Sequence, residues 1–313
     1  MRPIPDARSR ERFTVAEPGE PAIVIQRHPA VGDPRGDVVY VHGATFGADL
    51  SIFFPFDGHS WSDNLASAGF TVWGFDFVGY GLSDRSAADP DRPAGGMDAA
   101  VVELRRAIAA IRERNDDRPV FLLAHSRGAA VAARYAGEHP LDVRALALFA
   151  PIVPRAKSAM SRALSTTAPP SHYRLSAWAQ YRRFIDDVPR GQPQVLSEAH
   201  MHAWGTAFLA TDANAEGRAP PSVMIPSGPL ADIAEMWSGH WLYDPSAITV
   251  PTLIVRGEWD SLCDDSDAAK LIKALGTSEK RDVRIPRATH LMHLEEQRVA
   301  LYAEVSRFLD MHG

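Results

Sequence analysis

Short apolar runs alternate along the chain with longer segments in which apolar residues recur at helical spacing. Each run is rich in β-branched or aromatic residues and is bounded by turn residues, as is typical of strands. The five clearest runs are Val38–Val41, Thr71–Phe75, Val120–Leu123, Leu146–Phe149 and Leu253–Val255. Because these runs are continuously apolar, we predict a mostly parallel central sheet that is buried on both faces.

The segments between the runs have apolar residues at spacings of three and four, which places them on one helix face. Met97, Val101, Leu104, Ile108 and Ile111 follow this pattern, and Leu294, Leu301, Val305 and Phe308 repeat it near the end. Alternating strands and helices predict βαβ units, and hence an α/β fold with helices flanking the sheet. The beginning differs: residues 13–15 and 22–26 surround the turn PGEP and predict an antiparallel edge hairpin.

One long stretch, residues 154–244, breaks the alternation. It is rich in Pro, Ser, His and Trp and contains no clear strand–helix unit. Because structureless loops of this length are uncommon in compact domains, we predict a helical lid inserted into the fold. The core domain then comprises residues 1–153 and 245–313.

Composition narrows the classes of partner. The net charge is −6 with both signs interspersed and no basic block, so neither nucleic acid nor an anionic membrane is an expected partner. The first residues lack the apolar region of a secretory signal, and no apolar run approaches the roughly 20 residues of a membrane span. The single cysteine, Cys263, is expected to be a small buried residue. These features predict a cytoplasmic protein and leave open whether it is a monomer or a homodimer.

The segment Ala124-His125-Ser126-Arg127-Gly128 carries the first candidate chemistry. It follows the apolar run 120–123 and begins a segment of strong helix formers. A serine at a tight strand-to-helix turn is exposed at the carboxyl edge of the sheet, and small residues two before and two after it allow strand and helix to approach. Ser126 is therefore the candidate nucleophile; the alternative is a serine that only caps the helix.

A serine hydroxyl needs a base, and the base needs an acceptor that fixes its tautomer. His290 follows the strand-like segment 282–285, which places it at the same sheet edge as Ser126; His293 is its rival. Asp260 follows the run 253–255 at the carboxyl end of a predicted strand. Its rivals are Glu258, Asp264 and Asp265, whose positions also suit a solvated loop or a helix N-terminus.

The tetrahedral intermediate of acyl transfer needs hydrogen-bond donors for its oxyanion. The run 38–41 leads into His42-Gly43-Ala44-Thr45, where Gly43 permits a sharp turn that aims the Ala44 amide at the site. The second expected donor is the amide of Arg127 at the start of the helix. His42 is expected to brace the loop, and the Arg127 side chain to contact either a polar substrate group or a lid carboxylate.

Five segments together resemble the α/β-hydrolase superfamily in its lid-bearing, serine-hydrolase branch. They are HGAT (42–45), FDFVGYGLSDR (75–85), AHSRG (124–128), RGEWD (256–260) and ATHLMHLE (288–295). The resemblance implies that Ser126 attacks a carbonyl, that His290 is the base oriented by Asp260, and that water resolves the acyl-enzyme. The chain departs from the family pattern at Ala124, where glycine is usual. Because residue 126 is a serine, the resemblance disfavours the superfamily members that have an aspartate nucleophile.

Aromatic residues in the lid and beside the predicted motifs are candidates for the substrate pocket, although many such residues simply pack a lid onto its sheet. The candidates are Phe46, Phe53, Trp178, Tyr181, Trp204, Trp237, Trp241 and Trp259. They favour an apolar small molecule, of which aromatic and macrocyclic compounds are two examples. The leading hypothesis is a carboxylic ester or lactone hydrolase. The alternatives are a carbon–carbon bond hydrolase or lyase with the same triad, and a ligand-binding protein with little turnover. The sequence has neither a metal-ligand cluster nor a phosphate-cradling glycine loop, so no cofactor is expected.

Overall fold

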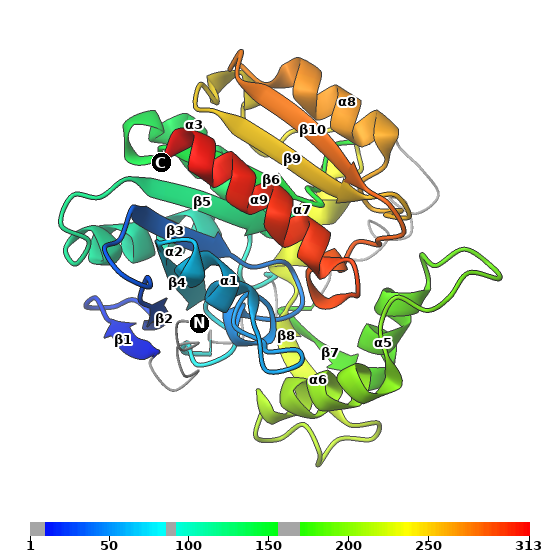
Figure 1. The fold of residues 1–313 in the computed structure, drawn as a ribbon. Coiled ribbons are helices and arrows are strands. Elements are labelled where there is room, and N and C mark those ends of the chain that lie inside the picture. The colour runs from blue at the N-terminus through cyan, green and yellow to red at the C-terminus, as the bar shows by residue number, and fades with distance from the viewer. Residues whose placement is uncertain (1–9, 86–91, 156–169) are drawn as a thin grey trace.

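The computed structural model describes residues 10–85, 92–155 and 170–313, and a single eight-stranded sheet runs through these residues (Figure 1). The strand order is β1-β2-β4-β3-β5-β6-β9-β10. The strands are β1 (Glu11–Val15), β2 (Ile23–His28), β3 (Gly36–Val41), β4 (Phe70–Asp76), β5 (Val120–His125), β6 (Ala145–Phe149), β9 (Thr252–Gly257) and β10 (Lys280–Ile285). Strands β4, β3, β5, β6, β9 and β10 are mutually parallel, which confirms the predicted sheet. The hairpin is also confirmed, since β2 is antiparallel to both β1 and β4.

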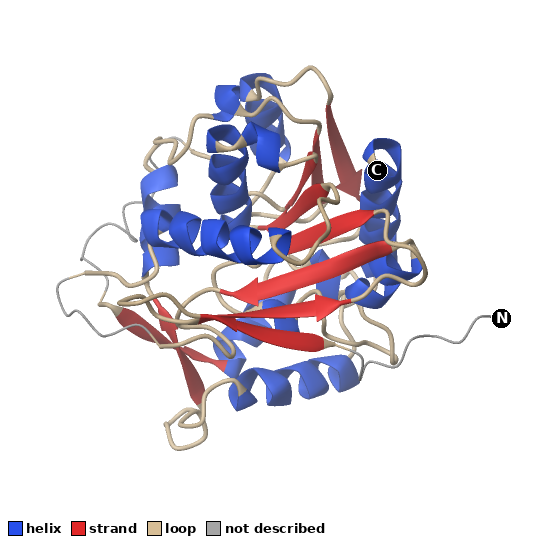
Figure 2. Cartoon of the chain, turned by 90° about the vertical axis from the view of Figure 1, so that its left-hand side faces the viewer, coloured by secondary structure: helices blue, strands red, loops and turns tan. Residues whose placement is uncertain are grey.

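Helices cover both faces of the sheet (Figures 1 and 2). The helices of the core are α1 (Trp61–Ser67), α2 (Met97–Arg112), α3 (Arg127–Glu138), α8 (Asp265–Ala274) and α9 (Arg298–His312). Short 3-10 turns add η2 (Ala48–Leu50), η3 (Pro140–Asp142), η4 (Pro245–Ala247) and η5 (Met292–Leu294). The last helix therefore starts later than predicted, and Leu294 and His293 belong to the 3-10 turn before it.

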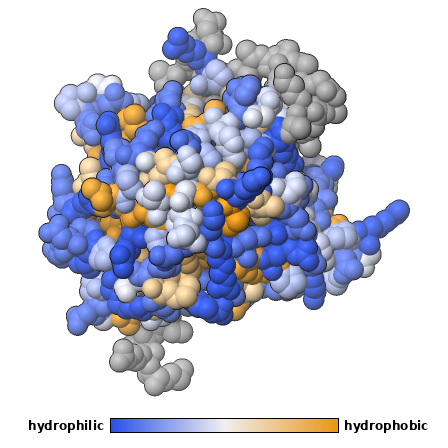
Figure 3. Space-filling model, turned by 90° about the horizontal axis from the view of Figure 1, so that it is seen from above, coloured by the Kyte–Doolittle hydropathy of each residue, from blue (hydrophilic) through white to orange (hydrophobic). Residues whose placement is uncertain are grey.

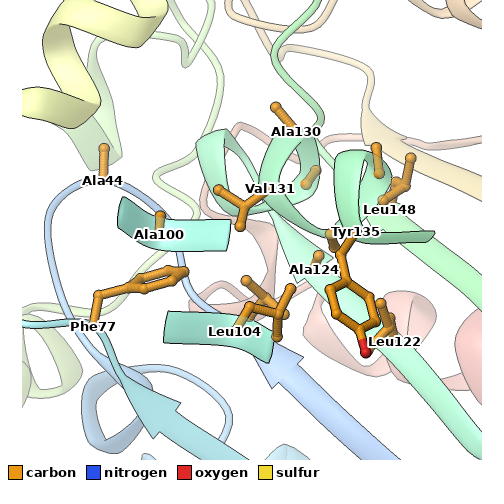
Figure 4. Packing of buried hydrophobic residues seen from close by; sticks show 14 of the residues in the cluster. Ala44, Phe77, Ala100, Leu104, Leu122, Ala124, Ala130, Val131, Tyr135 and Leu148 are labelled. Atoms are coloured by element: carbon orange, nitrogen blue, oxygen red, sulfur yellow. The ribbon is translucent and has the colours of Figure 1, made fainter. Parts of the chain in front are cut away.

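The buried strands divide their side chains between two cores because successive residues point to opposite faces. In β3, Val39 and Val41 pack with α2 and α3, whereas Val38 and Tyr40 pack with α1 and α9. Figure 4 shows the first of these cores, in which the side chains of Leu104, Leu122 and Val131 meet between helix and strand. Strands that are apolar on both sides are thus explained by helices on both sides.

A long inserted segment connects β6 to β9. Its described elements are β7 (His172–Ser176), α5 (Ala177–Ile185), α6 (Glu198–Ala210), β8 (Ser222–Pro226) and α7 (Gly228–Met236). The insertion contains helices, as predicted, but also two strands that were not predicted: β7 and β8 form an antiparallel pair in which Tyr173 faces Ile225. Residues 177–221 separate the two strands, so no local turn signal indicates their pairing. Residues 156–169 of the predicted lid lie outside the described residues.

Hydrophilic residues dominate the face shown in Figure 3, with apolar residues scattered among them. Within the three described ranges, no helix combines the length and the apolar character that crossing a bilayer requires. The single cysteine, Cys263, is fully buried as a free thiol, as expected.

Candidate active site

Ser126 occupies the tight turn between β5 and α3. Its backbone has φ 55° and ψ −124°, a conformation that side-chain-bearing residues rarely adopt. A Cβ at Gly128 would lie 2.2 Å from the carbonyl oxygen of His42, so only glycine lets α3 approach the end of β3 this closely. The Ser126 side chain makes no capping bond to α3, which argues against the helix-cap interpretation. The turn instead presents the hydroxyl to the carboxyl edge of the sheet.

His290 lies on the loop after β10, and its Nε2 is 2.8 Å from Ser126 Oγ. The neighbouring Thr289 donates its amide to Glu295 Oε2 at 3.0 Å, and His125 Nε2 donates to the His290 carbonyl at 3.0 Å. Glu295 is fully buried, and this burial raises its pKa to about 8. These contacts fix the backbone on both sides of the His290 ring.

Asp260 follows β9, and both of its carboxylate oxygens lie 3.0 Å from His290 Nδ1. Asp260 Oδ1 also accepts the amides of Leu262 at 2.8 Å and Cys263 at 3.1 Å, so the carboxylate is held as an acceptor. Because Asp260 accepts at Nδ1, Nδ1 carries the ring proton and Nε2 is left as the acceptor that faces Ser126. Ser126, His290 and Asp260 thus form one hydrogen-bonded chain.

The rival side chains are engaged elsewhere. Asp264 caps the N-terminus of α8, Asp265 pairs with Arg256, and Glu258 accepts the amide of Arg287.

His293 packs its ring against Phe46 and Phe149, and burial lowers its pKa to about 3. The structure therefore joins His290, and not His293, to Ser126.

The loop after β3 is braced by the segment after β4. Asp76 accepts the amides of Ala48 at 2.8 Å and Leu82 at 3.2 Å, and the hydroxyl of Tyr80 donates to the Ala44 carbonyl at 2.7 Å. Burial raises the pKa of Asp76 to about 6. The motif FDFVGYGLSDR was part of the resemblance to the superfamily, but its sequence did not show that Asp76 and Tyr80 hold the candidate oxyanion loop.

His42 reinforces the same loop, as expected from the sequence. Its Nε2 accepts the Phe77 amide at 3.0 Å, so its Nδ1 carries the proton and donates to the Gly43 carbonyl at 2.8 Å. Burial lowers the pKa of His42 to about 3, which keeps the ring neutral. Ala44 borders the cavity above Ser126, and Arg127 is the first residue of α3, where an amide has no partner within its own helix.

The profile of the serine aminopeptidase S33 family matches residues 32–297, which is most of the chain. The chain belongs to the S33 family. Its fold is the α/β-hydrolase fold, and it is a hydrolase by family. A comparison with curated proteins finds no match.

Solved structures share the fold at low sequence identity. A thioesterase domain from the curacin biosynthetic pathway is 18% identical with a TM-score of 0.65, covering 95% of this chain and 99% of that one. A soluble variant of the monoglyceride lipase from Saccharomyces cerevisiae is 16% identical with a TM-score of 0.68, covering 96% and 94%. A thermophilic esterase from Thermogutta terrifontis is 17% identical with a TM-score of 0.61, covering 97% and 100%.

In this S33 family member the Arg127 side chain joins the turn at Ser126 to the inserted segment. Its Nε and Nη2 donate to Asp232 Oδ2 of α7 at 2.8 and 2.5 Å, and Nη2 also donates to the Gly95 carbonyl at 2.8 Å. Asp232 further accepts the Met97 amide at the start of α2. Of the two roles predicted for this side chain, the structure shows the contact with a carboxylate of the insertion.

We expect Asp232→Asn to lower the free energy of unfolding by about 3 kcal/mol, because it leaves the buried guanidinium of Arg127 without its counter-charge. Urea denaturation measures the change. The control is Asp186→Asn, which removes an exposed pair with Arg182 and should cost less than about 0.5 kcal/mol. Equal effects of the two substitutions would show that the Arg127–Asp232 pair does not anchor α7.

A cavity of about 290 Å³ lies above Ser126 and His290 of this S33 chain, between the core and the inserted segment. Ser126, His290 and Ala44 border it from the core, and Arg183 borders it from α5. Apolar side chains form most of its wall: Phe46, Leu230, Ile233, Trp237, Leu262 and Leu291. A larger open hollow of about 880 Å³ lies between Arg85 and Arg218, and none of the triad residues borders it.

Of the eight aromatic residues predicted to line the substrate pocket, Phe46 and Trp237 border the cavity; the structure places the other six elsewhere. Phe53 lies in the core on the opposite face of the sheet, with α1 and α9. Trp204 is fully buried behind Phe46 and donates its indole N–H to the Leu50 carbonyl at 2.9 Å. Three others, Trp178, Tyr181 and Trp241, are exposed or partly buried. Trp178 packs on Tyr181, and Trp241 packs on the side chain of Lys270. Trp259 is partly buried outside the cavity.

Five lining residues were not among those predicted from the sequence: Arg183, Leu230, Ile233, Leu262 and Leu291. Leu230 and Ile233 are three apart on α7, a spacing that could have indicated a shared face. The other three carry no local signal. Among the described residues, no three or more His, Cys, Asp or Glu side chains are grouped so that they could hold a metal ion.

Proposed function

We propose that this chain is a serine hydrolase that cleaves a carboxylic ester or lactone of an apolar small molecule. The observation that carries the proposal is the hydrogen-bonded chain from Ser126 Oγ through His290 to Asp260, which opens onto an apolar cavity. A serine hydroxyl, a base and an orienting carboxylate in this arrangement suit acyl transfer.

The proposed reaction has two halves. Ser126 Oγ attacks the carbonyl carbon while His290 Nε2 takes the hydroxyl proton, and the amides of Ala44 and Arg127 donate to the oxyanion. The tetrahedral intermediate collapses, and His290 gives its proton to the leaving alcohol oxygen. Water then attacks the acyl-enzyme, His290 again takes the proton, and Ser126 is released with the carboxylic acid. Asp260 stabilises the imidazolium in both halves.

The family name would suggest a substrate with a peptide amino terminus. The cavity wall instead favours an ester substrate. Binding an N-terminal ammonium requires a carboxylate, and no Asp or Glu is among the cavity-lining residues of the described chain. A volume of about 290 Å³ is close to the lower end of the range for small-molecule pockets, which favours a compact apolar group over a macrocycle.

The test is a panel of nitrophenyl esters, lactones and aminoacyl anilides of increasing size, combined with labelling by a fluorophosphonate probe. We expect turnover of esters or lactones, a maximum at short or medium acyl length, and a single phosphonylated site at Ser126 in peptide mass spectra. Labelling of another residue, or hydrolysis of the anilides alone, would overturn the proposal.

A further inference from the structure

The proposed function leaves one feature of the cavity unexplained, namely a charged side chain in an otherwise apolar wall. Arg183 lies on α5 and borders the same cavity as Ser126 and His290. Burying a guanidinium against apolar surface is costly unless its donors find acceptors. The partners of Arg183 therefore decide whether it serves only to hold the fold together.

Arg183 is held in place but is not saturated. Its Nη2 donates to Asp187, one turn further along, and Asp187 in turn accepts the hydroxyl of Ser261, the neighbour of Asp260. These bonds connect α5 to the loop that carries the candidate catalytic acid. Within the described chain, however, Nη2 is the only nitrogen of this guanidinium with a hydrogen-bond partner, and the buried Nε has none. A guanidinium has five N–H donors, so most of the donors of Arg183 have no partner among the described residues.

A second unpaired donor lies in the same wall. Trp237 is 5% exposed and borders the cavity, and its indole N–H has no partner among the described residues. Buried donors without partners are rare because each costs about 1–3 kcal/mol. The nearby His125 is neutral, since burial and the adjacent histidines hold its pKa well below the usual range. Arg183 is therefore the one Arg or Lys among the lining residues of the described chain, and its ion-pair partner Asp187 lies outside that lining.

We propose that Arg183 is a specificity-determining residue that binds a carboxylate on the substrate, so that the preferred substrates are esters whose otherwise apolar carbon chain ends in a free carboxylate. This inference rests on the proposed function. A carboxylate provides acceptors for the unused guanidinium donors, and its charge is matched by the one cation in the wall. The apolar side chains between Arg183 and the triad would contact the carbon chain that joins the two ends of the substrate.

The neighbouring residue supplies a matched control. Arg182 and Arg183 belong to the same helix, and each pairs with an aspartate four residues on. The side chain of Arg182 is 56% exposed and borders no part of the cavity, whereas that of Arg183 is 29% exposed and borders it. Arg182→Gln therefore removes the same charge and the same type of ion pair without altering the cavity wall.

The experiment compares nitrophenyl monoesters of dicarboxylic acids with nitrophenyl esters of monocarboxylic acids of matched chain length. For wild type we expect a higher kcat/KM on the carboxylate-bearing ester at one or more lengths. Arg183→Gln should lower the ratio of the two kcat/KM values about 10- to 100-fold, mainly through KM on the charged ester, because a charge-assisted hydrogen bond is lost. Arg182→Gln should keep the wild-type ratio.

The proposal is overturned if wild type prefers the neutral ester at every length, a result that needs no variant. It is also overturned if Arg182→Gln and Arg183→Gln change the ratio equally. Should Arg183→Gln fail to fold, Arg183→Lys, which keeps the charge, is expected to give an intermediate ratio, and an unchanged ratio would count against the guanidinium. Failure of the proposed function is distinguishable, because then neither ester series turns over and the fluorophosphonate leaves Ser126 unlabelled.

Discussion

Replacing Ser126 with alanine will lower kcat/KM on the best ester by at least about 10⁴-fold. The substitution removes the oxygen that lies 2.8 Å from His290 Nε2 and leaves the cavity and the loop amides in place. Residual turnover then depends on water positioned by the histidine. Steady-state kinetics with Ser126→Ala as the blank for the whole substrate panel measures the loss.

Ser126→Gly is the companion variant, because it separates catalysis from backbone strain. It should be as inactive as Ser126→Ala. Its free energy of unfolding should exceed that of Ser126→Ala by about 1 kcal/mol, because φ 55° and ψ −124° suit glycine better than any residue with a Cβ. Thermal melting of the two variants measures the difference. If Ser126→Ala retained more than a tenth of wild-type kcat/KM, the nucleophile would have to be sought elsewhere.

The second large effect is expected for Asp260→Asn, which should lower kcat about 10⁴-fold without unfolding the protein. Oδ1 of Asp260 accepts the amides of Leu262 and Cys263, so those donors will hold the asparagine oxygen at that position. The amide nitrogen then takes the place of Oδ2, 3.0 Å from His290 Nδ1, and donates to it. The proton of the ring moves to Nε2, which can no longer accept the proton of Ser126.

Asp264→Asn is the control for this variant, since Asp264 is four residues away and caps α8 by accepting the amides of Ser266 and Asp267. Asparagine caps helices about as well as aspartate, so both kcat and the melting temperature should stay near wild type. Circular dichroism of Asp260→Asn checks that the variant is folded. Full activity in Asp260→Asn together with a large loss in Asp264→Asn would assign the orienting acid to Asp264.

The strands of the sheet, in their order along the chain, could be predicted from the sequence because the signals are local. Runs such as 38–41 and 120–123 are apolar at every position, which suits only strands covered on both faces. The turn at Ser126 is equally local, since it needs a strand before it, a helix after it and small residues at 124 and 128. His290 and Asp260 could be selected because each follows a strand, and parallel strands end at the same edge of a sheet.

The inserted segment could not be predicted in the same way. The strands β7 and β8 are far apart in sequence, and their pairing depends on how the insertion folds back. Aromatic residues were equally misleading there, since an aromatic side chain suits a core and a pocket wall alike. Trp204 became part of the packing behind Phe46, whereas Trp237 became part of the wall.

The sequence by itself thus determined the α/β fold, the turn at Ser126 and the order of the candidate triad, because each depends on neighbours in the chain. Only the tertiary structure decided which side chains line the cavity. The buried pair between Arg127 and Asp232 joins α7 to the turn at Ser126, and Leu230, Ile233 and Trp237 of this segment form part of the cavity wall. Arg183 enters that wall for the same reason: the orientation of a helix relative to the sheet is set by contacts between distant residues, which no local pattern records.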